Sequence, residues 1–337
     1  MRKKFFSFCI SLMLIFLVCF PLSACYTPTL KMSADFIQGW YCQDWTVENW
    51  DAKITELKND GFEEIIFQSS ISIENNSVDC YYNSPYFANL VDYECSVSPV
   101  LDNLLLSAKQ NNFKVILGLT STDSWWDNTN FANTEYCTNL ANFDAIAFDE
   151  IMSLFYENYS DTITGIYWAY EIYTQNQGFE LAWANIFNTV INHIDNSIYN
   201  MPICFSPFFS KYFACNNTQS ATMWKNFFSN TSLRNIDTIY PQDGFGGYSG
   251  IFSQSTANAL VEKMQILYNA CSQYSQCNFG INIEIFTNTS TVAEFSRVFE
   301  QIKQASRFTN KLICFSFSHF ADTHFTEDYQ NYISTLP

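Results

Sequence analysis

The chain has 337 residues, of which 48% are hydrophobic, 18% are aromatic and 15% are charged, and its formal net charge is −17. So acidic a chain is a poor partner for nucleic acid, because binding to phosphates requires Lys and Arg, and it suits a neutral or cationic ligand better than an anionic one. The length is sufficient for one large core such as a (β/α)8 barrel, which commonly takes about 250 residues.

The chain begins with the features of an export signal. Met1–Lys4 carries three basic residues, and an uncharged apolar run, Phe5–Phe20, follows it. This run is shorter than the about 20 residues that a membrane-spanning helix needs, and it is typical of a signal peptide. The segment Leu22–Cys25 resembles a bacterial lipobox, in which the cysteine is lipidated. We expect a signal peptide over residues 1–24, a tether over 25–34 and a barrel over 35–337.

The expected location is therefore outside the cytoplasm, on a cell membrane through a lipid at Cys25, with ordinary secretion as the alternative. Without the leader, 13 basic residues face 33 acidic ones, a net charge of −20. In an oxidising compartment, loop disulfides become plausible for Cys80 with Cys95 and for Cys271 with Cys277. The three histidines form no ligand cluster in the sequence, so we expect neither a metal site nor a cofactor.

Eight short apolar runs alternate with helical patterns along the chain. Such alternation predicts a parallel sheet with crossover helices, and eight strands with intervening helices favour a single closed (β/α)8 barrel of the α/β class over an open sheet. No dinucleotide-binding glycine motif follows the first run. The predicted strands are Asp35–Trp40, Glu64–Gln68, Phe113–Leu119, Ile163–Glu171, Pro202–Pro207, Ile236–Gln242, Phe279–Glu284 and Leu312–Phe317.

Glutamates end the fourth and seventh predicted strands, at Glu171 and Glu284. In a (β/α)8 barrel the active site lies at the carboxyl ends of the strands, and strands four and seven lie nearly opposite one another there. Glycoside hydrolysis needs two carboxylates of this kind. The structural alternative is a pair of carboxylates neutralised by Arg or Lys, but basic residues are scarce at the predicted strand ends.

Amide and aromatic side chains accompany the two glutamates. Amides can hydrogen-bond to sugar hydroxyls, and indole rings can stack on sugar faces. For the adjacent Trp125 and Trp126, we expect at least one ring to be exposed, whereas core packing is an equal alternative for Trp168. The residues predicted to bind substrate are Gln38, Trp40, Gln68, Trp125, Trp126, Tyr170, Gln242, Asp243 and His319.

Taken in order, eight sequence blocks resemble those of the DUF4434 family, and they cover nearly all of the chain after the leader. The resemblance implies a barrel of the glycoside hydrolase type, with Glu171 as acid/base and Glu284 as nucleophile. In the large retaining clan an Asn usually precedes the acid, and here Tyr170 stands in that place. The blocks are Phe36–Trp40, Ile65–Gln68, Leu117–Leu119 with Trp125 and Trp126, Tyr170–Ile172, Ser206–Phe209, Gln242–Gly244, Glu284–Phe286 and Cys314–His319.

The sequence thus predicts a hydrolase of O-glycosidic bonds that acts on an extracellular or cell-envelope polysaccharide. Asp243 would either orient Glu284 or bind a hydroxyl. The rival hypothesis is a non-catalytic glycan-binding lipoprotein on the same barrel. A hydrolase of another bond type is a weaker hypothesis, because the sequence lacks the Gly-x-Ser-x-Gly motif of a nucleophile elbow.

Overall fold

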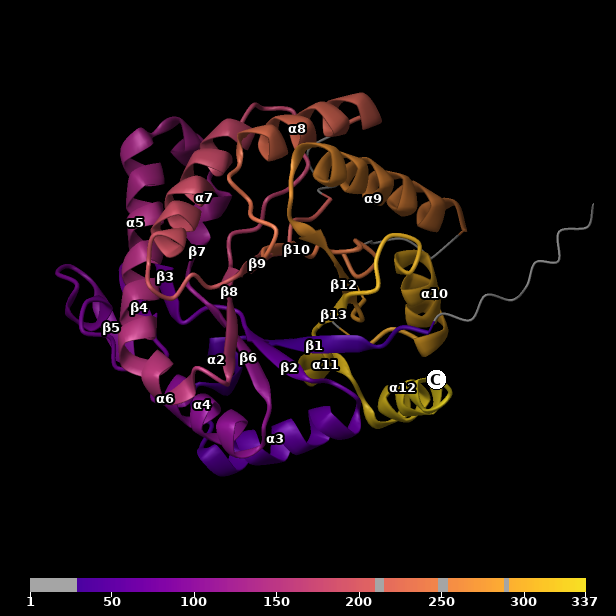
Figure 1. The fold of residues 1–337 in the computed structure, drawn as a ribbon, viewed down its shortest axis with the longest axis horizontal. Helices are drawn as coiled ribbons and strands as arrows, with labels where there is room; N and C mark the ends of the chain where they lie inside the picture. The colour runs from indigo at the N-terminus through magenta and orange to yellow at the C-terminus, as the bar shows by residue number, and fades with distance from the viewer. Residues whose placement is uncertain (1–28, 210–214, 248–253, 288–290) are drawn as a thin grey trace, which may run out of the picture.

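The structure is a computed structural model that describes residues 29–209, 215–247, 254–287 and 291–337. The basic start, the apolar run and Cys25 lie outside the described residues. Within these ranges the predicted (β/α)8 barrel is confirmed, with helices arranged around a parallel sheet (Figure 1). The strands of the barrel are β1 (Met32–Ile37), β2 (Glu64–Phe67), β6 (Lys114–Gly118), β8 (Ile163–Trp168), β9 (Ile203–Phe205), β10 (Thr238–Ile239), β11 (Asn278–Phe279), β12 (Ile281–Glu284) and β13 (Leu312–Phe315).

The sheet closes through Gly280, which separates β11 from β12. β11 pairs in parallel with β10, and β12 pairs in parallel with β13. The two segments therefore form the seventh strand of the barrel, and they match the predicted run Phe279–Glu284. β1 begins at Met32, three residues before the predicted strand, and its pairing with β2 ends at Ile37.

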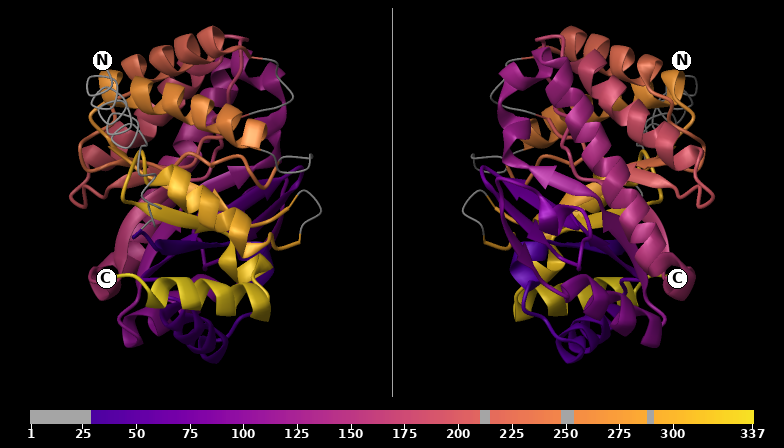
Figure 2. Two further views of the ribbon diagram at one scale, coloured as in Figure 1. Left: turned by 90° about the vertical axis from the view of Figure 1, so that its right-hand side faces the viewer. Right: turned by 90° about the vertical axis from the view of Figure 1, so that its left-hand side faces the viewer.

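Helices cover the outside of the barrel, and the side views show α10 and α12 side by side along it (Figure 2). The ring of Phe295 on α10 lies 5.8 Å from that of Tyr332 on α12. The helices are α2 (Gly39–Cys42), α3 (Val47–Asn59), α4 (Val100–Gln110), α5 (Thr134–Ile151), α6 (Glu157–Tyr159), α7 (Glu180–Asp195), α8 (Asn217–Asn230), α9 (Gln254–Tyr274), α10 (Phe295–Ala305), α11 (Phe317–Phe320) and α12 (Thr323–Ser334), with a π-helical turn (Met152–Tyr156) between α5 and α6.

Side chains of the barrel strands alternate between the barrel interior and the surrounding helices, as strand geometry requires. On β8, Tyr167 belongs to the small apolar cluster inside the barrel, whereas Trp168 packs on Phe187 of α7 with ring centroids 4.5 Å apart. The interior cluster also contains Phe36 and Ile66. Because this layer fills the barrel, the next inward-facing residue of each strand lies above it at the carboxyl end.

A second, four-stranded sheet is attached at this end and was not predicted from the sequence. Its strands are β3 (Ile71–Glu74), β4 (Ser77–Cys80), β5 (Glu94–Val97) and β7 (Thr120–Thr122), in the order β5-β4-β3-β7. β3 follows directly on β2, and β7 follows directly on β6, so the sheet extends two neighbouring barrel strands. It is followed by two 3-10 helices, Asp123–Trp126 and Asn128–Ala132. Figure 1 shows β3, β4 and β5 at the side of the barrel near α5.

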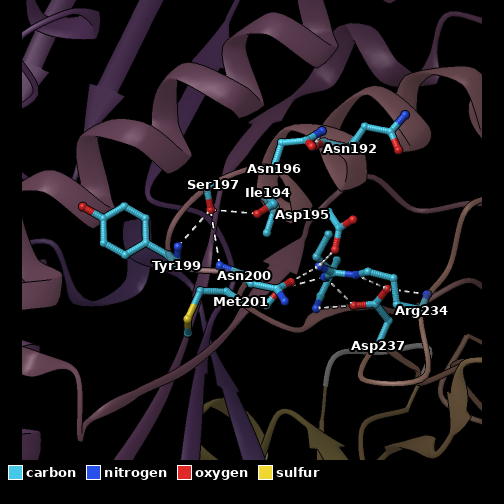
Figure 3. Close-up of polar contacts among 11 residues, drawn as sticks. Asn192, Ile194, Asp195, Asn196, Ser197, Tyr199, Asn200, Met201, Arg234 and Asp237 are labelled. Atoms are coloured by element: carbon cyan, nitrogen blue, oxygen red, sulfur yellow. Dashed lines mark hydrogen bonds and ion pairs between the residues drawn. The ribbon is translucent and has the colours of Figure 1, made fainter.

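A polar network at the amino end of the barrel fixes the entry to β9 and β10 (Figure 3). The Arg234 guanidinium donates to Asp237 Oδ1 over 2.8 Å, to Met201 O over 2.7 Å and to Asn200 Oδ1 over 2.7 Å. Asp237 is fully buried and also accepts a hydrogen bond from the backbone N–H of Ile203 over 2.9 Å. This network therefore stabilises the end of the barrel opposite to the candidate site.

Neither of the two disulfides that we considered plausible is formed, and all nine cysteines in the described part of the chain are free. Cys95 faces Val78 rather than Cys80 across the β4–β5 pair, so the sheet register separates them. The sulfurs of Cys271 and Cys277 are 3.4 Å apart. Within the described residues, no helix has the length and apolarity needed to span a membrane.

Candidate active site

The carboxyl end of the barrel carries a layer of inward-facing polar residues. Each lies two positions beyond an interior residue of its strand, because side chains alternate along the chain. Gln38 thus follows Phe36, Gln68 follows Ile66, and Gln242 follows Tyr240. By the same alternation Glu171 follows Ala169 and Glu284 follows Asn282, so both predicted glutamates belong to this layer.

Glu171 lies in the connection after β8, and its carboxylate is hydrogen-bonded to Gln242. The Gln242 Nε2 donates to Glu171 Oε1 over 2.8 Å. Burial raises the pKa of Glu171 from 4.5 to about 7, and the hydrogen bond from Gln242 opposes part of that rise. Among the described residues, no side chain or backbone group donates to Glu171 Oε2, so this oxygen can carry a proton toward a ligand.

Glu284 is the last residue of β12 and is only 4% exposed. Its Oε2 accepts hydrogen bonds from the backbone N–H groups of Gly246 over 2.6 Å and Gly247 over 3.3 Å. A Cβ at Gly246 would lie 2.7 Å from the Phe286 ring, so only glycine lets this N–H approach so closely. Burial raises the pKa of Glu284, and the negative charges of Asp243 and Glu171 raise it further.

Asp243 points outward, away from the barrel interior, and supports Glu284. Its carboxylate accepts from Gln301 Nε2 over 2.6 Å and from the backbone N–H of Glu284 over 3.4 Å. Arg297 donates to the backbone carbonyl of Glu284 over 2.8 Å, and its positive charge lowers the pKa of Asp243 against the effect of burial. Of the two roles predicted for Asp243, orienting Glu284 is the one that these contacts support.

A cleft of about 300 Å³ opens above Glu171. The amide groups of Gln38 and Gln68 face it and make no hydrogen bond with any described residue, so they are available to a ligand. Gly118 permits the close packing of this wall, because a Cβ there would lie 2.0 Å from the backbone oxygen of Gln68. The predicted site residues that line the cleft are Gln38, Trp40, Gln68, Trp125, Trp126, Tyr170 and Glu171.

Two tryptophans present their rings to solvent at the cleft. Trp40 is 62% exposed and Trp126 is 49% exposed, and both lie on the cleft wall. Trp126 is supported from behind by Tyr173, with stacked rings 6.0 Å apart. Trp40 does not lie on β1 as predicted but on α2, the short helix that follows it. These rings could each cover one face of a sugar.

Trp125 has a different environment from Trp126. It is 1% exposed, and its ring is stacked on Tyr170 and Trp183 at 5.0 and 6.0 Å. Its indole Nε1 donates to the backbone carbonyl of Glu171 over 2.9 Å. Trp125 therefore positions the Glu171 backbone, and Trp126 is the member of the pair with the exposed face.

Asp144, a buried carboxylate on α5, supports the segment that carries Glu171. The pattern of strand ends in the sequence does not indicate it. It accepts from Thr120 Oγ1 over 2.7 Å and from Trp168 Nε1 over 2.8 Å, and burial raises its pKa to about 7. Thr120 Oγ1 in turn lies 2.7 Å from the hydroxyl of Tyr170. Because that hydroxyl is engaged by Thr120, the outward-facing Tyr170 supports the backbone next to Glu171.

His319 lies on α11, beside Trp40 and Tyr41. Its ring centroid is 4.0 Å from that of Tyr41 and 5.5 Å from that of Trp40. Burial lowers its pKa to about 4, so the ring is neutral near pH 7. The helix that carries it is held by Asp35, whose carboxylate accepts from the backbone N–H groups of Phe317 over 2.6 Å and Ser318 over 2.9 Å.

The structure brings Glu171 and Gln242 into contact and places Glu284 in the same layer. The supporting residues Asp144, Arg297 and Gln301 come from helices, and no strand-end pattern indicates them. In the described residues no group of three or more His, Cys, Asp or Glu side chains is arranged to hold a metal ion. The cleft offers the partly exposed carboxylate of Glu171, neutral amide groups and exposed indole rings, and the buried carboxylate of Glu284 lies in the same layer outside the cleft lining.

Comparison with known proteins supports this architecture. The model of a domain of unknown function, DUF4434, matches residues 32–324. A solved structure described as a putative alpha-L-fucosidase from Bacteroides thetaiotaomicron superposes with a TM-score of 0.72 at 19% identity, covering 92% of this chain and 94% of its own.

Two further solved structures are more distant. An endo-1,4-beta-mannanase from Rhizomucor miehei has a TM-score of 0.53 at 11% identity, covering 91% of this chain and 95% of its own. Endo-glycoceramidase II from Rhodococcus sp. has a TM-score of 0.52 at 10% identity, covering 86% and 74%. At these identities the likeness shows a shared fold. No curated protein matches the chain.

Proposed function

The chain belongs to the DUF4434 family, and we propose that it is a glycoside hydrolase that cleaves O-glycosidic bonds with Glu171 and Glu284. The observation that carries the proposal is the pair of glutamates in one inward-facing layer, of which Glu284 is buried and Glu171 is partly exposed at the cleft. Unequal environments are how an active site separates an acid from a base. The barrels of glycosidases that superpose on the chain support the same reaction class.

Glu171 suits the role of general acid. A pKa raised to about 7 by burial keeps the carboxyl largely protonated under mildly acidic conditions. The Gln242 amide occupies one carboxyl oxygen, which leaves the other to protonate the glycosidic oxygen as the bond breaks. If the reaction passes through a covalent intermediate, the same group, now ionised, accepts a proton from the water that hydrolyses that intermediate.

Glu284 suits the role of nucleophile or base. Its Oε2 accepts two backbone N–H groups, which favour the carboxylate and so oppose part of the rise in pKa that burial and the charges of Asp243 and Glu171 cause. Loss of the proton to solvent leaves an anion that can act at the anomeric carbon. Whether that anion attacks the carbon or activates a water determines retention or inversion of configuration.

The cleft chemistry supports a carbohydrate as the ligand. Sugar hydroxyls require groups that both donate and accept, and the amides of Gln38 and Gln68 offer both. The rings of Trp40 and Trp126 supply flat apolar surfaces beside them. No Lys or Arg lies on the described cleft wall, in keeping with a neutral sugar chain.

The test is hydrolysis of a panel of neutral plant, fungal and bacterial polysaccharides, in which the release of reducing ends is measured. We expect the wild type to cleave at least one polysaccharide, and Glu171→Gln and Glu284→Gln to reduce the rate at least a hundredfold, with the fold intact. Full activity in both variants would refute the assignment of the two carboxylates. A glycan-binding protein would instead bind without turnover and remain insensitive to both substitutions.

We further propose that the enzyme acts outside the cytoplasm, held to a membrane by a lipid on Cys25. The basic start, the apolar run and the lipobox-like Leu22–Cys25 support this location. Metabolic labelling with a fatty acid should mark the wild type and leave Cys25→Ser unlabelled. Labelling of both proteins, or of neither, would contradict the anchor.

A further inference from the structure

A second cavity, of about 570 Å³, lies next to the catalytic cleft. Thr122 and Asp123 belong to the walls of both, so the end of β7 is their common boundary. The far side of this cavity is formed by one face of α5, on which Tyr136, Asn139 and Phe143 recur at helical spacing. The cavity thus adjoins the catalytic cleft across Thr122 and Asp123.

The boundary between the two cavities is held in place by its own hydrogen bonds. Ser124 Oγ lies 2.9 Å from Thr122 Oγ1 and 3.1 Å from the hydroxyl of Tyr136. Asn130 Nδ2 donates to the backbone carbonyl of Ser124 over 2.9 Å. A wall fixed in this way is present before any ligand binds, which lowers the cost of binding.

The walls combine aromatic rings with side-chain amides. Tyr93, Tyr136 and Phe143 supply the rings, whereas Asn75 and Asn139 supply amides that hydrogen-bond to no described residue. Among the described wall residues there is no Lys, Arg or His, so an anionic ligand has no counter-charge there. Available amides beside half-buried rings are the composition that also characterises the catalytic cleft.

We propose that this cavity is a distal subsite that binds further units of a neutral oligosaccharide chain extending over Asp123 from the catalytic cleft. The substrate is then an oligosaccharide or polysaccharide bound over several units. This inference rests on the proposed function, because it assumes that the neighbouring cleft holds the sugar next to the cleaved bond.

Binding measured without turnover tests the subsite. The Glu171→Gln protein is first applied to an array of neutral oligosaccharides, and a ladder of two to eight units of the best-bound sugar is then titrated by calorimetry. We expect affinity to rise with length beyond the units that fill the catalytic cleft. Asn75→Ala and Asn139→Ala, each introduced singly into the Glu171→Gln protein, should lower the affinity for the longest chains about fivefold, because each removes one hydrogen bond to the ligand.

Asn142→Ala is the matched control, since Asn142 is also exposed on α5 but does not line the cavity. This control should leave the affinity for every chain length unchanged. Asn75→Ala and Asn139→Ala should leave the affinity for the shortest chains unchanged. Length-independent affinity, or long-chain affinity that survives both substitutions, would overturn the subsite even if the protein hydrolyses glycosides. Failure to bind any oligosaccharide would overturn the subsite and the proposed function together.

Discussion

The Nε2 of Gln242 donates to Oε1 of Glu171 over 2.8 Å, and it is the only described side chain that hydrogen-bonds to this carboxylate. The two residues follow different strands of the barrel, β8 and β10, and face inward in the same layer. Gln242 stabilises the ionised form of Glu171, whereas burial favours the protonated form. The balance of these two effects sets the pKa of the proposed acid.

Replacement of Gln242 by Met keeps the volume but removes the donor. The pKa of Glu171 should then rise further, so that the alkaline limb of the pH–rate profile moves up by about one pH unit. The maximal rate should fall about tenfold, because the carboxyl loses its fixed orientation. The measurement is kcat/KM from pH 4 to 9, and an alkaline limb at the wild-type position would contradict this role.

In the wild type, activity should decline as the pH rises through about 7. The reason is that the proposed acid, Glu171, loses its proton near that pH. Initial rates on the cleaved polysaccharide, measured in buffers of constant ionic strength, give the profile. Constant activity from pH 6 to 9 would mean that Glu171 does not act as an acid.

Removal of the Glu171 charge should stabilise the protein at high pH. The group has a pKa of about 7 in the folded chain and 4.5 as its ordinary value, so the folded state holds more protons between these values. Stability is therefore lost as the pH rises from about 4.5 to about 7, by on the order of 3 kcal/mol. Glu171→Gln should melt at a higher temperature than the wild type at pH 8 and at nearly the same temperature at pH 4.5. An equal rise in melting temperature at pH 8 and at pH 4.5 would rule out this link between the Glu171 pKa and stability.

Replacement of Arg234 by Met should destabilise the fold without affecting catalysis. The substitution leaves Asp237 buried without its cation, and loss of one partner of a buried ion pair costs about 3–5 kcal/mol. Urea unfolding should show the loss, whereas kcat/KM per folded molecule should equal that of the wild type. A changed kcat/KM would show that the amino end of the barrel communicates with the site.

Trp126→Ala should weaken substrate binding while leaving the fold intact, because the ring is 49% exposed. We expect KM to rise about tenfold with little change in kcat, since under the proposed function the ring would stack on a sugar away from the cleaved bond. Trp125→Phe is the comparison, since it removes the indole donor to the Glu171 backbone. That variant should lower kcat instead. If both substitutions altered only KM, the distinct roles of the two tryptophans would be wrong.

The barrel could be predicted because each strand lies in a short apolar run, and the two glutamates could be predicted because each closes one of these runs. Alternation along these strands also separates Glu171, which faces inward, from Tyr170, which faces outward. The contributions of Asp144 and Arg297 could not be predicted, since they depend on which turn of a packed helix faces a strand end. The second sheet, of β3, β4, β5 and β7, escaped prediction because its short strands mix polar and apolar residues and form no continuous apolar run.

The most direct test of the account compares leaving groups in the two glutamate variants. The substrates are aryl glycosides of the sugar at the newly formed reducing end, with a phenyl or a 2,4-dinitrophenyl group. Glu171→Gln should lose at least a hundredfold in kcat/KM on the phenyl glycoside and little on the dinitrophenyl glycoside, whose leaving group departs without a proton. Glu284→Gln should lose activity on both. Equal losses for both leaving groups in Glu171→Gln would contradict its assignment as the acid.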